Sequence, residues 1–276
     1  DGSGLVFPKG TWKTAVYESG LIWGAIVNRP GEEDPHVGGS TYRSGLQGGK
    51  ILSSGEPEDP NLPHVRIYRV RPDVYPGGPW IDLSVEAFDE GKTEIEIRTQ
   101  YELDWTEWRA IDGAPFEDID ANGFYDPNTD VPGVPGAAQT IWFVANDLDA
   151  ARTFFMYGTA PMGVEFQATY WEYRNGSFLE NLFFRKYKLI NKSTLPFNDM
   201  YISMWSDPDV GTSTDDFVGC DTTLNMVYAY NADELDQVYD PYPPPAIGFD
   251  LLKGPTVQGN QNLSMTAAYY LLRDDP

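Results

Sequence analysis

Oxygen-bearing side chains alternate along one short stretch of the chain, DIDANGFYD from residue 118. This is the D-x-D-x-N-G-x-x-D pattern of a calcium-binding loop. The alternation brings Asp118, Asp120 and Asn122 around one point, and the glycine that follows permits a sharp turn. The carbonyl of Phe124 can then point inward. Because calcium takes six to eight hard oxygen ligands, the pattern predicts a calcium site.

Two more acidic residues complete the predicted ligand set. Asp126 is expected to bind directly or through water, and Asp130 follows the position, Thr129, at which an EF-hand keeps its bidentate glutamate. A helix-loop-helix EF-hand is therefore not expected. Four carboxylates within 13 residues would repel one another in a compact loop, which favours a bound Ca²⁺ with a structural role. The alternative is a flexible turn rich in Asp and Asn.

A second group of acidic residues also follows a predicted strand. Asp207-Pro208-Asp209 lacks a defined loop template, but its two carboxylates are candidate ligands of a second metal ion. The competing interpretation is that acids at this and other strand ends are solvated or cap turns.

Residues for familiar catalytic chemistry are scarce. The only histidines are His36 and His64, which we expect in loops, and neither lies near a nucleophile motif. Zinc-binding motifs and a phosphate-binding glycine loop are also missing from the sequence. A glycosidase needs only two carboxylates, and 42 acidic residues leave that alternative open. We nevertheless predict that the chain is not an enzyme.

The charge balance limits the partners. Nineteen basic and 42 acidic residues give a net charge of −23, which repels phosphate backbones and anionic lipids, so no nucleic-acid partner is expected. No apolar run reaches the roughly 18 residues that cross a bilayer, so no membrane insertion is expected. The chain begins at Asp1, which predicts a processed end or part of a larger protein. Cys220 is the single cysteine and is expected to be buried beside its strand.

One helix stands out among the predicted elements. Between Thr93 and Trp108, aromatic and aliphatic residues recur at spacings of 4, 4 and 3 on one face, at Ile97, Tyr101, Trp105 and Trp108. Thr93 and Glu96 form a capping box. We interpret the two tryptophans as packing against a sheet rather than as a platform for sugars.

The rest of the chain reads as short strands separated by turns rich in its 27 Gly and 22 Pro. This predicts a mainly β fold, a β-sandwich of jelly-roll or immunoglobulin type with long loops and one helix around 93–108, as a single domain over residues 1–276. The predicted strands are Ala15–Tyr17, Leu21–Val27, Val65–Val70, Thr140–Ala145, Val164–Tyr173, Asn181–Asn191, Met200–Trp205, Leu224–Tyr230, Ala246–Leu252 and Met265–Leu272.

Four segments carry a family resemblance: Gly2–Leu5, Gly38–Leu46, Asp118–Asp149 and Lys186–Asp221. Together they resemble the N-terminal region of large, uncharacterised secreted proteins of Bacteroidota, which commonly end in a type IX secretion sorting domain. The resemblance implies export to the cell surface or the medium, but it supplies no catalytic residues. It also draws attention to Thr222, because Asp-Thr-Thr resembles the short O-glycosylation motif of such bacteria.

These observations favour a calcium-stabilised extracellular or cell-surface module with a structural or adhesive role, such as a subunit of a surface assembly or filament. Its expected partners are other copies of itself or other surface proteins. The alternative is a carbohydrate-binding module that binds polysaccharide, since eight Trp and 17 Tyr could provide stacking faces. A carboxylate-dependent glycoside-active domain is a further alternative.

Overall fold

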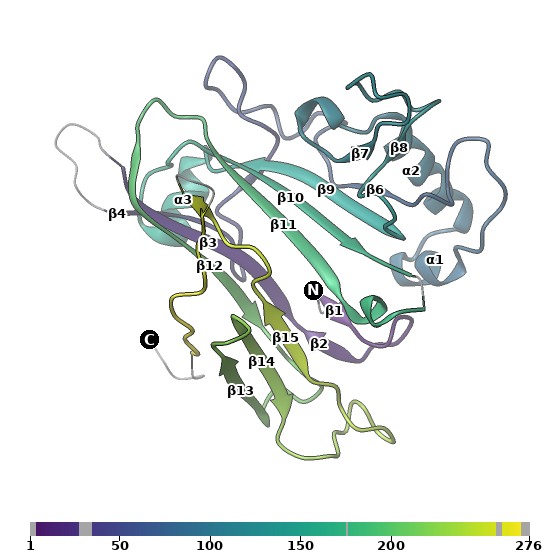
Figure 1. Ribbon diagram of the computed structural model, residues 1–276, viewed down its shortest axis with the longest axis vertical. Helices are drawn as coiled ribbons and strands as arrows, with labels where there is room; N and C mark the ends of the chain where they lie inside the picture. The colour runs from purple at the N-terminus through teal and green to yellow at the C-terminus, as the bar shows by residue number, and fades with distance from the viewer. Residues whose placement is uncertain (1–3, 28–34, 175, 258–260, 272–276) are drawn as a thin grey trace. The chain divides into compact units, whose positions relative to one another are not determined.

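The computed structural model describes residues 4–27, 35–174, 176–257 and 261–271 (Figure 1). The fold is mainly β, with 36% strand and 14% helix, three α-helices and several antiparallel sheets. The predicted mainly β, sandwich-like class is therefore confirmed. The residues group into two compact units: unit 1 holds residues 1–21 and 204–276, and unit 2 holds residues 22–203. The single domain over the whole chain stays a prediction.

The main sheet of unit 2 is antiparallel. Its strands are β11 (Phe183–Asn191), β10 (Val164–Glu172), β9 (Gln139–Asn146) and β5 (Gln47–Gly48), in this order, and β6 (Tyr68–Val70) also pairs with β9. Aromatic and β-branched residues dominate β9 and β10, which suits strands that are covered on both faces.

A smaller sheet covers one face of this main sheet. It contains β3 (Glu18–Val27) and β4 (Pro35–Gly39), with β12 (Phe197–Asp207) in the order β12-β3-β4. Trp23 of β3 stacks on Phe166 of β10 at 5.9 Å between ring centroids. Gly38 permits this packing, because a Cβ there would lie 2.6 Å from the Trp23 indole nitrogen. The two layers explain the sandwich-like pattern in the sequence.

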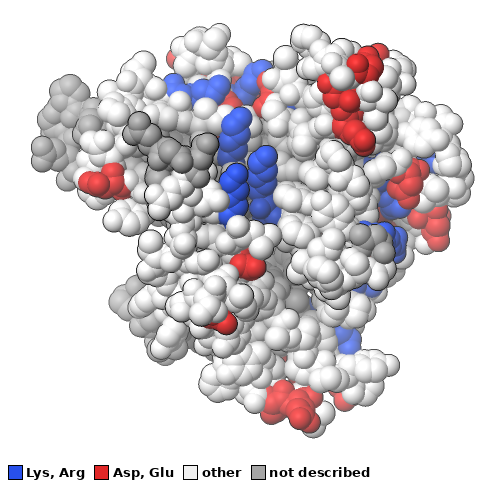
Figure 2. All heavy atoms as spheres, viewed as in Figure 1, with Lys and Arg blue, Asp and Glu red and all other residues white. Residues whose placement is uncertain are grey.

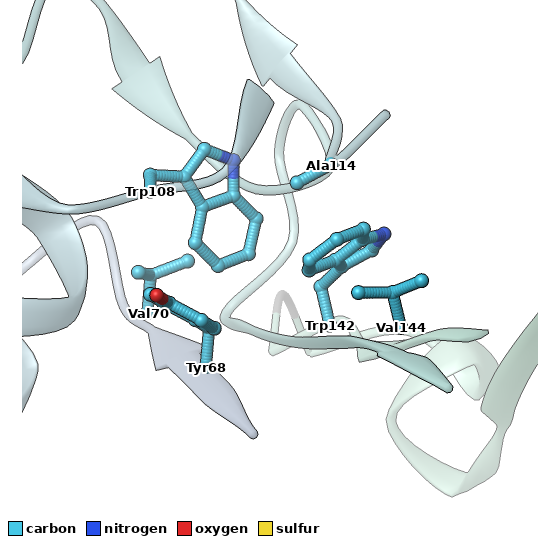
Figure 3. Close-up of a cluster of buried hydrophobic side chains, with 6 residues drawn as sticks. All are labelled: Tyr68, Val70, Trp108, Ala114, Trp142 and Val144. Carbon is cyan, nitrogen blue, oxygen red and sulfur yellow. The ribbon is translucent and has the colours of Figure 1, made fainter. Parts of the chain in front are cut away.

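Helices and loops cover the other face. A buried cluster of Tyr68, Val70, Trp108, Ala114, Trp142 and Val144 lies there, and Figure 3 shows the three large rings turned toward one another. The predicted helix is α2 (Glu94–Thr106), which begins with the predicted capping box between Thr93 and Glu96. Trp105 and Trp108 are both buried, but α2 ends before Trp108, and it is Trp108 that packs on the sheet, against Tyr68 and Trp142.

Two further α-helices were not predicted. α1 (Ser84–Glu90) packs against α2 through Leu83, Ala87 and Ile97, and α3 (Ala150–Tyr157) is capped by Asp149. Both are short, so their periodicity is weak in the sequence. Single 3-10 turns, η1 (Ala110–Asp112) and η2 (Phe178–Asn181), complete the helical part.

Unit 1 contains small antiparallel sheets. β1 (Leu5–Val6) pairs with β2 (Thr14–Val16), and β16 (Thr256–Val257) pairs with β17 (Gln261–Asn262). A third sheet has the order β13-β14-β15, formed by β13 (Asp216–Asp221), β14 (Met226–Asn231) and β15 (Ile247–Asp250).

Two predictions for unit 1 are wrong. Residues 265–271 form no strand, although they are rich in aromatic and aliphatic side chains, and Leu272 lies outside the described residues. Cys220 is exposed on β13 rather than buried, because neither face of β13 is covered: none of its residues is buried.

Candidate metal centre

A two-stranded ladder holds the predicted calcium loop closed. β7 (Phe116–Glu117) pairs antiparallel with β8 (Val131–Pro132), with Phe116 opposite Pro132 and Glu117 opposite Val131. Residues 118–130 are therefore the loop of a hairpin: Asp118 directly follows the paired Glu117, and Asp130 directly precedes the paired Val131. The ladder brings Asp118 and Asp130 together although 11 residues separate them in the chain.

Three of the predicted ligands gather in this loop. Asp118, Asp120 and Asp130 each offer a carboxylate oxygen, and these oxygens lie within 4.8 Å of one another. Asp130 is 1% exposed, Asp118 is half-buried and Asp120 is exposed. The cluster thus has a buried base and an open side, and no other such group of His, Cys, Asp or Glu side chains occurs among the described residues.

Backbone amides fix the orientation of the buried carboxylate. Asp130 accepts hydrogen bonds from the backbone N–H groups of Ile119, at 2.9 Å, and Asp126, at 2.8 Å. Its two oxygens therefore connect the start of the loop to its end. A buried carboxylate with both oxygens bonded is held in place before any ion arrives.

The tip of the loop wraps around Asp118. The backbone N–H groups of Asn122 and Gly123 donate to its two oxygens at 3.1 and 2.7 Å. Gly123 has a φ of 82°, in the left-handed region that favours glycine, and so does Ala121 at 56°. The sharp turn predicted at this glycine is present.

The remaining predicted ligands point to other partners. Asp126 Oδ1 accepts both the backbone and side-chain N–H of Asn128 at 2.9 Å, which lowers the pKa of Asp126. Asn122 donates its side-chain amide to Asp120 at 2.8 Å and accepts the Phe124 N–H at 2.7 Å. The Phe124 side chain is 72% exposed. Coordination by Asn122, the Phe124 carbonyl or Asp126 stays a prediction.

Aromatic residues anchor the loop to α2. Tyr125 donates its hydroxyl to the Trp105 carbonyl at 2.6 Å, and Trp105 donates its indole N–H to the Pro127 carbonyl at 3.0 Å. The Tyr125 ring also packs edge-on against Phe116 at 5.6 Å. Burial, followed by the charges of Asp130 and Asp126, raises the pKa of Tyr125. The sequence predicted the helix and the loop separately, but it did not predict the contact between Tyr125 and Trp105.

The donor set suits a hard divalent cation. It offers carboxylate oxygens and no sulfur or imidazole, which is the chemistry that calcium prefers. None of the ion pairs recorded in the described part of the chain uses Asp118, Asp120 or Asp130. The three negative charges are thus left without a protein cation, and an ion could offset their repulsion.

The second candidate site lies in unit 1. Burial, followed by the charge of Asp207, raises the pKa of Asp209. Burial also raises the pKa of the nearby Asp216 to about 6, with further contributions from Asp215, Asp209 and Asp236. Asp207 and Asp209 are not in the three-carboxylate group found among the described residues. Their role as ligands stays a prediction.

Thr222 lies in the turn between β13 and β14 and is exposed. The turn is held by Asp221, whose Oδ1 accepts the backbone N–H and the hydroxyl of Thr223 at 2.8 and 2.6 Å. The Asp-Thr-Thr motif is therefore accessible at the surface, and its glycosylation stays a prediction.

The histidines are placed differently from one another. His36 is buried in β4, with Nδ1 2.9 Å from the Ala160 carbonyl oxygen, so its expected loop position is wrong. His36 lies in a strand because β4 pairs with β3 although β4 contains two glycines. His64 lies in a turn with Nε2 3.0 Å from Glu58.

The tryptophans bear on the alternative of sugar binding. Trp23, Trp105, Trp108 and Trp142 are buried, and Trp171 and Trp205 are half-buried. The two exposed ones, Trp12 at 72% and Trp80 at 59%, belong to different units. Since a sugar platform needs aromatic rings together on one face, the tryptophans by themselves do not favour one.

None of the helices in the described ranges is long and apolar enough to cross a membrane. Comparison of the chain with protein-family models, curated protein sequences and solved structures gives no match.

Proposed function

We propose that this chain is a calcium-stabilised structural or adhesive module of an extracellular or cell-surface assembly, without a catalytic role. The observation that carries the proposal is the gathering of Asp118, Asp120 and Asp130 at the closed end of the β7–β8 hairpin. The resemblance to secreted Bacteroidota proteins supports the location.

The loop is well placed to act as a brace. Its inner side connects to α2 through Tyr125 and Trp105, and its base continues into β7 and β8. An ion bound by carboxylates from both ends of the loop would therefore tie the helix and the hairpin together. Calcium at about 100 times its dissociation constant would stabilise the fold by about 2.7 kcal/mol. Such a role needs no bound substrate and no moving part.

The test is thermal unfolding of the chelator-treated protein with and without calcium. We expect calcium to raise the melting temperature of the unaltered protein and to leave that of Asp120→Ala unchanged. Asp120 is the suitable position because its exposed side chain accepts only from Asn122. Its loss removes a ligand without opening the core.

Asp59→Ala is the matched control. Asp59 is also an exposed aspartate whose Oδ1 accepts the N–H groups of an asparagine two residues later, at 2.9 Å, but it lies outside the carboxylate cluster. This control should keep the full calcium response. A melting temperature of the unaltered protein that ignores calcium would contradict the proposal.

A further inference from the structure

Asn122 and Gly123 form an asparagine-glycine pair in the loop of residues 118–130, and both residues are exposed. The chain contains one other such pair, at residues 175 and 176. This dipeptide is especially prone to deamidation, because glycine has no side chain to shield the attacking nitrogen and its backbone turns freely. A Cβ added at Gly123 would meet no atom within 4 Å, so the pair is open to water.

The reaction needs only the pair itself and water. The backbone nitrogen of Gly123 loses its proton and attacks the side-chain Cγ of Asn122. A new C–N bond forms, the bond from Cγ to Nδ2 breaks, and Nδ2 leaves with that proton as ammonia. Water then opens the five-membered imide at one of its two carbonyls. The product is an aspartate at position 122, or an isoaspartate in which the main chain runs through the side-chain carbon.

The closed loop holds both reacting groups by hydrogen bonds. The Gly123 N–H donates to Asp118 Oδ2 at 2.7 Å. The Asn122 side chain accepts the Phe124 N–H through Oδ1 at 2.7 Å and donates from Nδ2 to Asp120 Oδ2 at 2.8 Å. Ring closure consumes the Gly123 N–H and pulls the Asn122 side chain towards that nitrogen. These three hydrogen bonds therefore oppose the reaction.

We infer that Asn122 is a site of spontaneous deamidation and that closure of the loop through Asp118 controls its rate. The reaction proceeds through the fraction of molecules in which the loop is locally open. Deamidation at Asn122 is thus slow in the closed loop and fast in the open one. Neither step requires a bound ion.

The products change the loop permanently. An aspartate at position 122 puts a carboxylate oxygen where an N–H donor now lies 2.8 Å from Asp120, so two negative charges face each other. The calcium-loop pattern accepts asparagine or aspartate at this position. An isoaspartate breaks the pattern, because it lengthens the main chain by one carbon. Figure 2 shows acidic side chains gathered at the surface near β7 and β8, and either product adds a charge there.

The experiment is peptide mapping by mass spectrometry after incubation of the full chain at mildly alkaline pH. Chelator is present throughout, so the outcome does not depend on the proposed calcium site. We expect conversion of Asn122 to be at least about tenfold slower in the folded protein than in urea. Asn61 is the internal control: it is exposed and donates its amide to an aspartate two residues earlier at 2.9 Å, but a leucine follows it. It should stay largely unconverted.

Removal of single acceptors tests the role of the closed loop. D118A takes away the acceptor of the Asn122 and Gly123 N–H groups and should speed conversion in the folded protein by about tenfold. D59A, outside the loop, should leave the rate at Asn122 unchanged. Thermal unfolding checks that D118A still folds. D120A, which removes the acceptor of the Asn122 side-chain amide, should also speed conversion and gives a second measurement.

Three results would overturn the inference: no conversion of Asn122 in urea, equal rates in the folded and unfolded protein, or rates in folded D118A and D120A that match the unaltered protein. The melting-temperature response to calcium is measured separately on fresh protein. A missing response would defeat the proposed function and leave this inference standing.

Discussion

The buried carboxylate of Asp130 accepts the backbone N–H of Ile119 at 2.9 Å, although the two residues stand at opposite ends of the acidic loop. Its other oxygen accepts the N–H of Asp126 at 2.8 Å. Asp130 is therefore both a candidate ligand and the residue that closes the loop. Its two roles can be separated experimentally.

Replacement of Asp130 by alanine should destabilise the protein even when calcium is absent. Two backbone N–H groups would lose their acceptor in a buried place, at a cost of about 1–3 kcal/mol for each group. Urea unfolding in the presence of a chelator measures this cost. Asp120→Ala is the comparison, and equal unfolding free energies of the two variants in chelator would contradict the closing role.

The stability of unit 1 should depend on the charge of Asp216. Burial raises the pKa of this carboxyl from 3.8 to about 6, and its Oδ1 is buried without a hydrogen-bond partner among the described residues. The folded state thus holds a proton that the unfolded state releases, so stability falls as the pH rises from about 4 to about 6.

Asp216→Asn removes this penalty, and the new amide oxygen can still accept the Val210 N–H that Asp216 accepts at 2.9 Å. At pH 7 the melting temperature of the variant should exceed that of the unaltered protein by about 2–4 °C for each kcal/mol of unfolding free energy gained. At pH 4 the two melting temperatures should be equal. Melting curves in chelator at both pH values test this. An equal increase in melting temperature at pH 4 and pH 7 would rule out the charge of Asp216 as the cause.

Asp147 should contribute far more stability than Asp149, two residues later. Asp147 is fully buried and accepts the N–H groups of Met162, Gly163 and Val164 at 2.8–3.0 Å. Asp147→Ala leaves three buried donors unpaired, so we expect a loss of about 3 kcal/mol or more. Asp149→Ala removes the N-cap of α3 and should cost about 1 kcal/mol. Chemical denaturation of the two variants would refute this ranking if their midpoints coincided.

Gly38 should resist substitution because it lies beneath Trp23. A Cβ at this position would lie 2.6 Å from the indole nitrogen, so Gly38→Ala forces Trp23 away from Phe166 at a cost of about 1–3 kcal/mol. Gly24→Ala is the control in the paired strand, where the nearest atom is 3.6 Å from the added Cβ. Thermal unfolding of both variants measures this difference in stability. Equal melting temperatures would argue against a steric conflict between residue 38 and Trp23.

The sequence predicted local features well where several signals agreed. The capping box and the helical spacing of Ile97, Tyr101 and Trp105 both predicted the helix that the structure shows as α2. The loop pattern likewise placed Asp118 and Asp120 together and identified the turn at Gly123. Each of these depends on residues close in sequence, for which spacing fixes geometry.

Features that depend on distant contacts were less accessible. The anchoring of the loop by Tyr125 on Trp105 joins a turn to a helix 20 residues away, and no local pattern encodes it. Residues 265–271 have the composition of a strand but no strand partner, so composition alone predicted one wrongly. Cys220 is exposed because neither face of β13 is covered, and which strand faces are covered depends on distant parts of the chain.

Calorimetric titration of chelator-treated protein with calcium tests the central claim most directly, because it counts ions as well as measuring affinity. The unaltered protein should bind calcium, and Asp120→Ala should bind one ion fewer, while Asp59→Ala matches the unaltered protein. Titrations in which Asp120→Ala binds as many ions, with the same affinity, as the unaltered protein would show that calcium does not bind at the loop of residues 118–130.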